Sequence, residues 1–87
     1  MRELKIIKIT EDDREYYIVA FDRRTVDSEV AHFIGFDDGK SYRACAKKVS
    51  KAQCIDGYNI GFEDREEAEK CLTWANSCRI LKGMGIR

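Results

Sequence analysis

Residues 62–78 read FEDREEAEKCLTWANSC, and this stretch decides the fold because it signals a helix both at its start and along its length. Asp64 is a good N-cap residue and Glu67 follows three places later, which is the arrangement of a capping box. Spacings of three and four residues place five small or apolar side chains on one face: Ala68, Cys71, Leu72, Ala75 and Cys78. Trp74 borders that face. The pattern predicts an amphipathic helix that must pack on a sheet to bury this face.

The segments upstream of this helix supply the strands of the predicted sheet. Residues 3–10, ELKIIKIT, and residues 16–21, YYIVAF, are rich in β-branched and aromatic side chains and flank an acidic turn, so they predict a β-hairpin. Residues 30–36, VAHFIGF, alternate in a way typical of a third strand, and residues 58–62 predict a further short strand. Residues 79–87 show no periodicity and are expected to fray.

Residues 41–54, SYRACAKKVSKAQC, carry two competing periodicities. A strand here would follow an Asp-Gly turn and pair with the preceding strand. A helix would have Ser41 as its N-cap and would place five side chains on one face: Tyr42, Cys45, Ala46, Val49 and Ala52. Because Ala, Lys, Arg and Gln favour helices, a helix over residues 41–53 is the preferred interpretation. The expected fold is α+β: one domain, residues 1–87, with an antiparallel sheet and the two helices packed on one of its faces.

Composition and charge exclude several classes of protein. The chain has 87 residues, enough for one domain, and with 44% hydrophobic and 37% charged residues it is globular rather than disordered. Its net charge of zero argues against a partner that binds the whole surface electrostatically, such as bulk DNA. No apolar run approaches the ~20 residues of a membrane span, and the charged N-terminus does not match a signal peptide. We therefore expect a cytoplasmic protein with no membrane partner and with thiols at Cys45, Cys54, Cys71 and Cys78.

Basic residues concentrate in one segment. Residues 40–55 contain five basic and no acidic residues, whereas residues 1–39 contain six basic and ten acidic ones. In a helix the basic side chains form a strip that could meet phosphates or an acidic protein surface: Lys40, Arg43, Lys47, Lys48 and Lys51. Tyr42 and Tyr58 complete the candidate binding site, because tyrosine beside arginine is typical of protein-binding surfaces. The alternative is that the strip is simply the solvated face of an amphipathic helix.

Residues suited to catalysis or metal binding do not converge in the sequence. His32 is the single histidine, and no serine or cysteine stands in a nucleophile motif. Cys45 and Cys54 are nine residues apart and Cys71 and Cys78 are seven apart, whereas structural zinc sites space paired ligands by two to four residues. The glycines match no phosphate-binding loop. We therefore expect no enzyme activity, no bound metal and no cofactor.

These observations favour a small non-catalytic binding protein that occupies a surface on a larger protein or ribonucleoprotein. Compact single domains without catalytic motifs are typical of phage- or mobile-element-encoded inhibitors of host defence, of the anti-CRISPR kind, and this is the specific form of the hypothesis. The alternative is a nucleic-acid-binding regulatory module that uses residues 40–51. A third hypothesis is a protein that responds to metal or redox state through its thiols.

Overall fold

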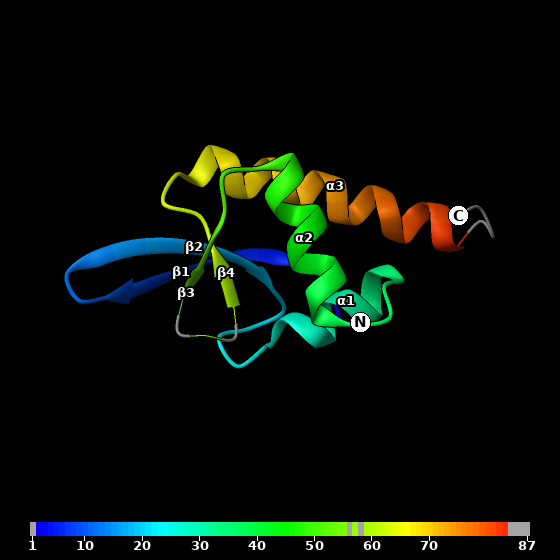
Figure 1. The fold of residues 1–87 in the computed structure, drawn as a ribbon, viewed down its shortest axis with the longest axis horizontal. Coiled ribbons are helices and arrows are strands. Elements are labelled where there is room, and N and C mark those ends of the chain that lie inside the picture. The colour runs from blue at the N-terminus through cyan, green and yellow to red at the C-terminus, as the bar shows by residue number, and fades with distance from the viewer. Residues whose placement is uncertain (1, 56, 58, 84–87) are drawn as a thin grey trace.

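Three helices and two antiparallel hairpins make up the described part of the chain (Figure 1). The structure is a computed structural model and describes residues 2–55, 57 and 59–83. The elements follow one another as strands β1 (Lys5–Glu11) and β2 (Arg14–Ala20), helices α1 (Asp27–Ile34) and α2 (Gly39–Val49), strands β3 (Gln53–Ile55) and β4 (Asn59–Gly61), and helix α3 (Arg65–Gly83). This arrangement confirms the predicted α+β class.

The hairpin of β1 and β2 forms where it is predicted. Its register runs from the pair Lys5 and Ala20 to the pair Glu11 and Arg14, next to a turn of two residues. Those residues, Asp12 and Asp13, have φ angles of 49° and 62°, in the left-handed region that aspartate tolerates better than most residues. Two successive left-handed residues make a type I′ turn, which matches the right-handed twist of the strands. A tight hairpin therefore forms here without glycine.

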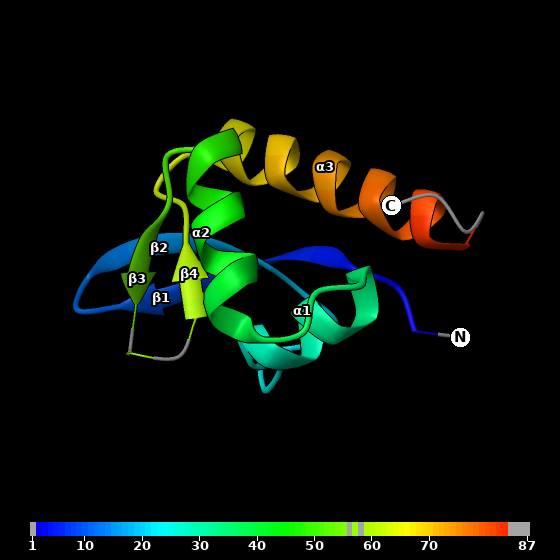
Figure 2. The same cartoon turned by 45° about the vertical axis from the view of Figure 1, so that its right-hand side comes forward.

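A single bridge joins the two hairpins. Tyr17 and Phe62 exchange two backbone hydrogen bonds of 2.8 Å, so the strands lie in the order β1, β2, β4, β3. Helix α3 runs across one side of these strands, with α2 and α1 beside it (Figures 1 and 2). The main core fills the space between this side and the helices, and its buried members are Leu4, Val19, Phe21, Val30, Ala31, Ile34, Tyr42, Ala46, Ile60, Phe62, Ala68, Cys71 and Ala75.

The other face of the β1–β2 hairpin carries a smaller apolar cluster. Its buried members come from β2 and β3: Tyr16, Ile18, Ala20 and Ile55. Ile7 and Ile9 of β1 pack against these residues but remain partly exposed. The strand β1 is therefore apolar on a face that no helix covers.

Helix α3 buries the face that its sequence predicts. The Glu66 N–H donates to Asp64 Oδ1 (3.0 Å), so Asp64 caps the helix. The most buried members of the predicted face are Ala68, Cys71 and Ala75, each 0% exposed. Leu72 and Cys78 are half-buried and pack against the core from its margin. The predicted capping box also requires the Glu67 side chain to bond back to the N-cap. This part of the prediction is wrong, because the Glu67 carboxylate contacts the end of α2 instead.

The prediction that residues 79–87 fray is wrong over residues 79–83. Helix α3 continues to Gly83, and residues 84–87 lie outside the described part of the chain. Arginine, leucine and lysine are good helix formers, so nothing in residues 79–82 ends the helix once its first turns are packed.

Helix α1 corrects the prediction of a third strand over residues 30–36. Its buried apolar side chains are Val30, Ala31 and Ile34. These positions share one face of a helix, whereas His32, which strand alternation would bury with Val30 and Ile34, is exposed. Gly35 ends the helix with a φ of 101°, and its N–H donates to the carbonyl of Ala31 (3.0 Å).

Helix α2 resolves the two periodicities of residues 41–54 in favour of a helix. It begins earlier than predicted, because Asp38 rather than Ser41 is the N-cap and accepts a hydrogen bond from the Ser41 N–H (2.7 Å). It ends at Val49, and the chain then turns into β3. Tyr42 and Ala46 face the core, as predicted.

Candidate functional site

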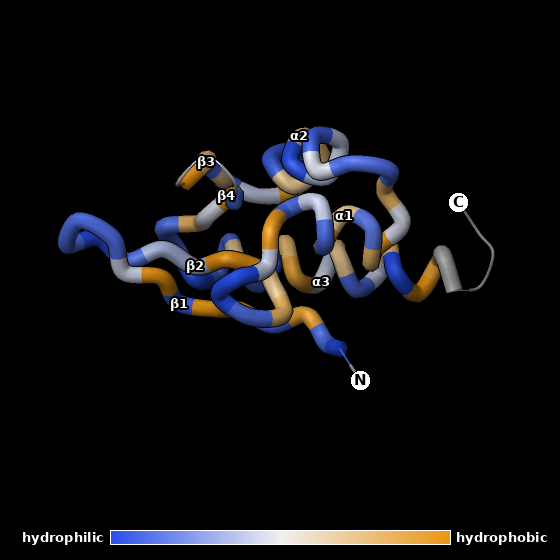
Figure 3. Tube along the Cα trace, turned by 90° about the horizontal axis from the view of Figure 1, so that it is seen from below, coloured by the Kyte–Doolittle hydropathy of each residue, from blue (hydrophilic) through white to orange (hydrophobic). Residues whose placement is uncertain are grey.

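Four exposed lysines lie on the outward face of α2 or in the two residues that follow the helix. We call them the basic face: Lys40, Lys47, Lys48 and Lys51. Steps of three and four residues connect Lys40, Ala44, Lys47 and Lys51, so these positions lie along one side of the helix and its end. Figure 3 shows α2 at one margin of the molecule, largely in hydrophilic colours. The predicted basic strip is therefore present and exposed at four of its five positions.

The charge of the basic face is not neutralised within the described residues. None of its four lysines lies in an ion pair there, and α2 contains no acidic residue. Basic side chains elsewhere do have carboxylate partners: Arg2, Lys8, Arg14, Arg65 and Lys70. The basic face is thus a local excess of positive charge on a protein whose formal net charge is zero.

Arg43, the fifth basic residue predicted for the strip, faces inward. Its Nε lies 3.2 Å from Asp27 Oδ2, and the Asp27 side chain at the start of α1 is only 6% exposed. Gly39 allows this approach: a Cβ on Gly39 would stand 3.2 Å from the backbone nitrogen of Ser28, so a larger residue would push the helix starts apart. Arg43 therefore positions α2 against α1 instead of extending the basic face.

The two tyrosines assigned to the candidate site do not extend it. Tyr42 is 1% exposed and its ring stacks on Trp74 with centroids 6.2 Å apart. Burial raises its pKa well above the ordinary value. Tyr42 is a core residue with no exposed surface to offer a partner. Tyr58 lies outside the described residues.

Carboxylates stand at both ends of the basic face. At its start, the Ser41 amide hydrogen bond and the nearby Lys40 charge lower the pKa of Asp38. At its end, Lys51 lines a shallow surface depression together with three acidic residues: Glu63, Asp64 and Glu67. The positive surface is therefore short. Its length along the helix is roughly 16 Å, from a rise of 1.5 Å per residue.

The thiols are spread through the fold. Burial raises the pKa of the Cys71 thiol to about 12, whereas Cys54 is exposed on β3 and Cys45 and Cys78 are half-buried. Within residues 2–55, 57 and 59–83, no three side chains of the metal-binding types come together. His32 lies on the exposed side of α1. Among the described helices, none combines the length and hydropathy that crossing a bilayer requires.

Comparison with protein-family models, with curated proteins and with solved structures finds no match. The basic face is a group of exposed cations that, unlike Arg2, Lys8, Arg14, Arg65 and Lys70, have no carboxylate partner among the described residues. No sequence signal indicated the inward turn of Arg43, because its partner Asp27 lies sixteen residues away in another element.

Proposed function

We propose that this is a small non-catalytic binding protein whose basic face docks on an acidic surface of a larger protein. The observation that carries the proposal is the set of four exposed lysines on and just after α2 that have no ion-pair partner in the described structure. A helix anchored on its other side by Tyr42 and Ala46 presents these charges on a rigid element. Complementary charge on a partner would speed association and select that partner.

A protein partner is favoured over nucleic acid by the limits of the positive surface. A duplex presents a continuous row of phosphates, and a strip bounded by Asp38 at one end and by Glu63 and Glu67 at the other would meet it with like charge. The basic face also has no exposed aromatic side chain among its described residues on which a base could stack. A compact acidic patch on a protein fits a short strip of lysines without this repulsion.

Two narrower forms of the function remain hypotheses. A phage- or mobile-element-encoded inhibitor of host defence would use the basic face to occupy an acidic surface on its target. A regulatory module that binds nucleic acid through residues 40–51 is the alternative, supported by the same uncompensated lysines. Identifying the captured partner distinguishes them.

Capture with paired charge-reversal variants tests the proposal. Lys47→Glu/Lys48→Glu reverses two adjacent charges on the basic face, and Arg23→Glu/Arg24→Glu makes the same change in net charge at exposed residues before α1. We expect wild-type protein and the Arg23/Arg24 variant to capture the same discrete protein from the source cell, and the Lys47/Lys48 variant to lose it.

Two results would contradict the proposal. One is equal capture by all three proteins, which would place the partner's contacts elsewhere. The other is binding of wild type to unrelated duplexes near 150 mM salt, lost only in the Lys47/Lys48 variant, with affinity falling steeply as salt rises. That second pattern would favour the nucleic-acid module.

A further inference from the structure

The outer edge of β1 is open. In the described part of the chain β1 pairs with β2 and with no other strand. Because the turn has two residues, Glu11 and Arg14 form a hydrogen-bonded pair. Hydrogen-bonded and non-hydrogen-bonded pairs alternate along an antiparallel ladder. Lys8 and Tyr17 are therefore a pair without mutual hydrogen bonds. Tyr17 bears this out, because its N–H and C=O turn away from β1 and bond Phe62 at 2.8 Å.

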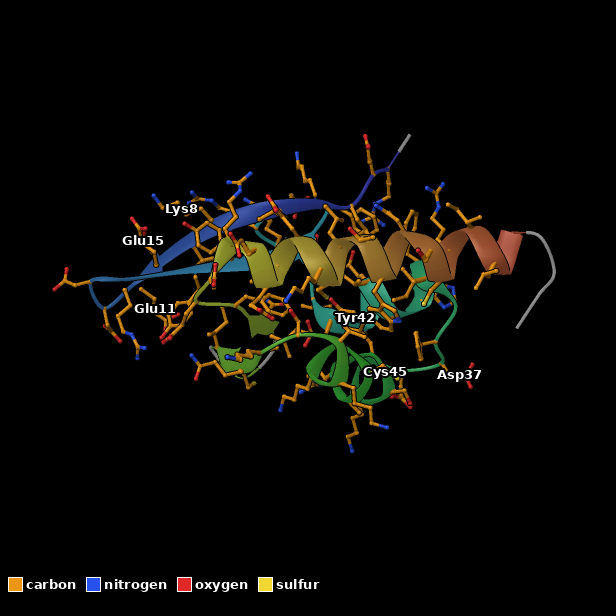
Figure 4. The ribbon with its side chains drawn as sticks, turned by 90° about the horizontal axis from the view of Figure 1, so that it is seen from above. Lys8, Glu11, Glu15, Asp37, Tyr42 and Cys45 are labelled. Atoms are coloured by element: carbon orange, nitrogen blue, oxygen red, sulfur yellow. The ribbon has the colours of Figure 1, made fainter. Side chains whose placement is uncertain are left out.

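The same alternation points a row of β1 backbone groups away from the molecule. The outward N–H and C=O groups belong to Ile6, Lys8 and Thr10. Proteins often protect such an edge with lysine. Here Lys8 Nζ lies 2.9 Å from Glu15 Oε1 on the neighbouring strand, so its charge is already paired (Figure 4). This leaves Lys5 as the one unpaired lysine on the edge strand among the described residues.

We propose that β1 pairs antiparallel with β1 of a second copy of this chain, with Lys8 on the two-fold axis. In that register Ile6 faces Thr10 of the second copy, and all seven residues of β1 are paired. Lys5 faces Glu11 of the second copy, and the symmetry makes this contact twice. Two copies of β1 placed antiparallel therefore set opposite charges against each other at both ends.

The register also covers apolar surface. Ile7 would face Ile9 of the second copy, on the face where both side chains now lie partly exposed. Each such pair would continue the intramolecular pairs of Ile7 with Ile18 and of Ile9 with Tyr16, giving rows of four apolar side chains across the joined sheet. The approach of Lys8 to its symmetry mate opposes pairing, and the nearby Glu15 of each copy offsets it.

The edge and the basic face lie on opposite margins of the molecule. Figures 3 and 4, from below and from above, both place β1 at one side and α2 at the other. Pairing of β1 therefore leaves the basic face accessible, and the dimer does not depend on the function proposed above.

Complementary charge variants test this register. In Glu11→Lys the contact becomes lysine against lysine, and in Lys5→Glu it becomes glutamate against glutamate, so each variant alone should dimerise at least about tenfold more weakly than wild type. An equimolar mixture of the two variants restores both lysine–glutamate contacts. Sedimentation equilibrium should show that the mixture regains wild-type affinity.

Matched controls separate the register from net charge. Glu66→Lys and Arg24→Glu make the same charge changes at exposed positions away from β1 and should dimerise like wild type, as should their mixture. Wild-type amide exchange gives a second readout that needs no variant: the N–H groups of Ile6, Lys8 and Thr10 should become protected as concentration rises. A wild type that stays monomeric, or a Glu11/Lys5 variant mixture no stronger than its components, would overturn the proposal.

Discussion

Glu67 in the first turn of α3 binds the end of α2 at Ser50. The Lys51 N–H donates to Glu67 Oε2 (3.1 Å), and the Ser50 hydroxyl donates to the same oxygen (2.8 Å). Lys70 Nζ lies 3.2 Å from the other carboxylate oxygen. These donors favour the ionised carboxylate, with the Lys51 amide contributing most, and lower the pKa of Glu67 to about 2. The contact joins Ser50 and Lys51, the residues that follow α2 and include the last lysine of the basic face, to the start of α3.

Folding stability should depend on pH through Glu67. Because its folded pKa is depressed from 4.5 to about 2, its contribution is fully present above pH 4.5 and is lost as pH falls toward 2. Glu67→Gln should lower the free energy of unfolding at pH 7 and remove part of the decline in acid. Urea unfolding between pH 7 and pH 2 measures both effects.

Glu66→Gln is the control, since Glu66 is exposed in the same turn and its carboxylate makes no hydrogen bond or ion pair in the described structure. The free energy of unfolding of the Glu66→Gln variant should fall in acid as it does for wild type. Equal behaviour of the two variants would mean that the contact with Ser50 and Lys51 contributes nothing.

The ion pair of Asp27 and Arg43 should be costly to break from one side. Arg43→Met would leave the Asp27 carboxylate, whose side chain is 6% exposed, without its cation. We expect the free energy of unfolding to fall by about 3 kcal/mol. Asp27→Asn/Arg43→Met should cost less than the sum of the single changes, because no buried charge remains. Lys47→Met, at an exposed lysine without an ion pair in the described structure, should change the free energy of unfolding by no more than about 0.5 kcal/mol. Urea unfolding measures all of these variants. An Arg43 effect as small as this control would count against a structural role for the pair.

The thiols should react in an order set by burial. Cys54 is exposed and should react first with a thiol reagent, ahead of the half-buried Cys45 and Cys78. Cys71 is 0% exposed and burial raises its pKa to about 12, so it should react only on unfolding. Mass spectrometry of peptides labelled in native and denaturing conditions gives the order. Rapid native labelling of Cys71 would show that α3 does not pack as described.

The turn of the first hairpin should be open to stabilisation. Asp13 has a φ of 62°, a conformation in which glycine pays no steric penalty, and Asp-Gly is a preferred type I′ sequence. Asp13→Gly should therefore raise the unfolding free energy by about 0.5 to 1 kcal/mol, as measured by thermal or urea unfolding. Asp37→Gly, at an exposed residue without positive φ whose side chain makes no hydrogen bond or ion pair in the described structure, should not. A destabilised Asp13 variant would mean that the turn has another geometry.

The sequence predicts those elements that have an explicit start signal and a consistent period. Helix α3 has Asp64 as its cap and a regular buried face, and the hairpin has two β-rich runs around an acidic turn. Helix α1 has neither. Its N-cap position is Val26, which makes no side-chain cap, and its eight residues suit a strand pattern almost as well. Gly35 is left-handed at the end of α1, and glycine is common at that position of helices, so it is the one local feature of this segment that agrees with a helix.

The site could be predicted only as far as local spacing determines it. The exposed lysines of the basic face follow from the period of α2 alone. The inward turn of Arg43 and the role of Glu67 depend on partners in other elements, Asp27 and Ser50, which helix periodicity does not reveal. Tertiary contacts therefore removed one basic residue from the predicted strip and reassigned a predicted capping residue.

Lysine footprinting of the captured complex tests the central claim most directly. Reductive methylation labels exposed lysines, and a docked partner shields those that it covers. We expect Lys40, Lys47, Lys48 and Lys51 to lose reactivity in the complex relative to the free protein, while Lys5, exposed on β1 at the opposite margin, keeps its reactivity. Unchanged labelling of the basic face, with protection at Lys5 or elsewhere, would contradict the claim that this face is the binding surface.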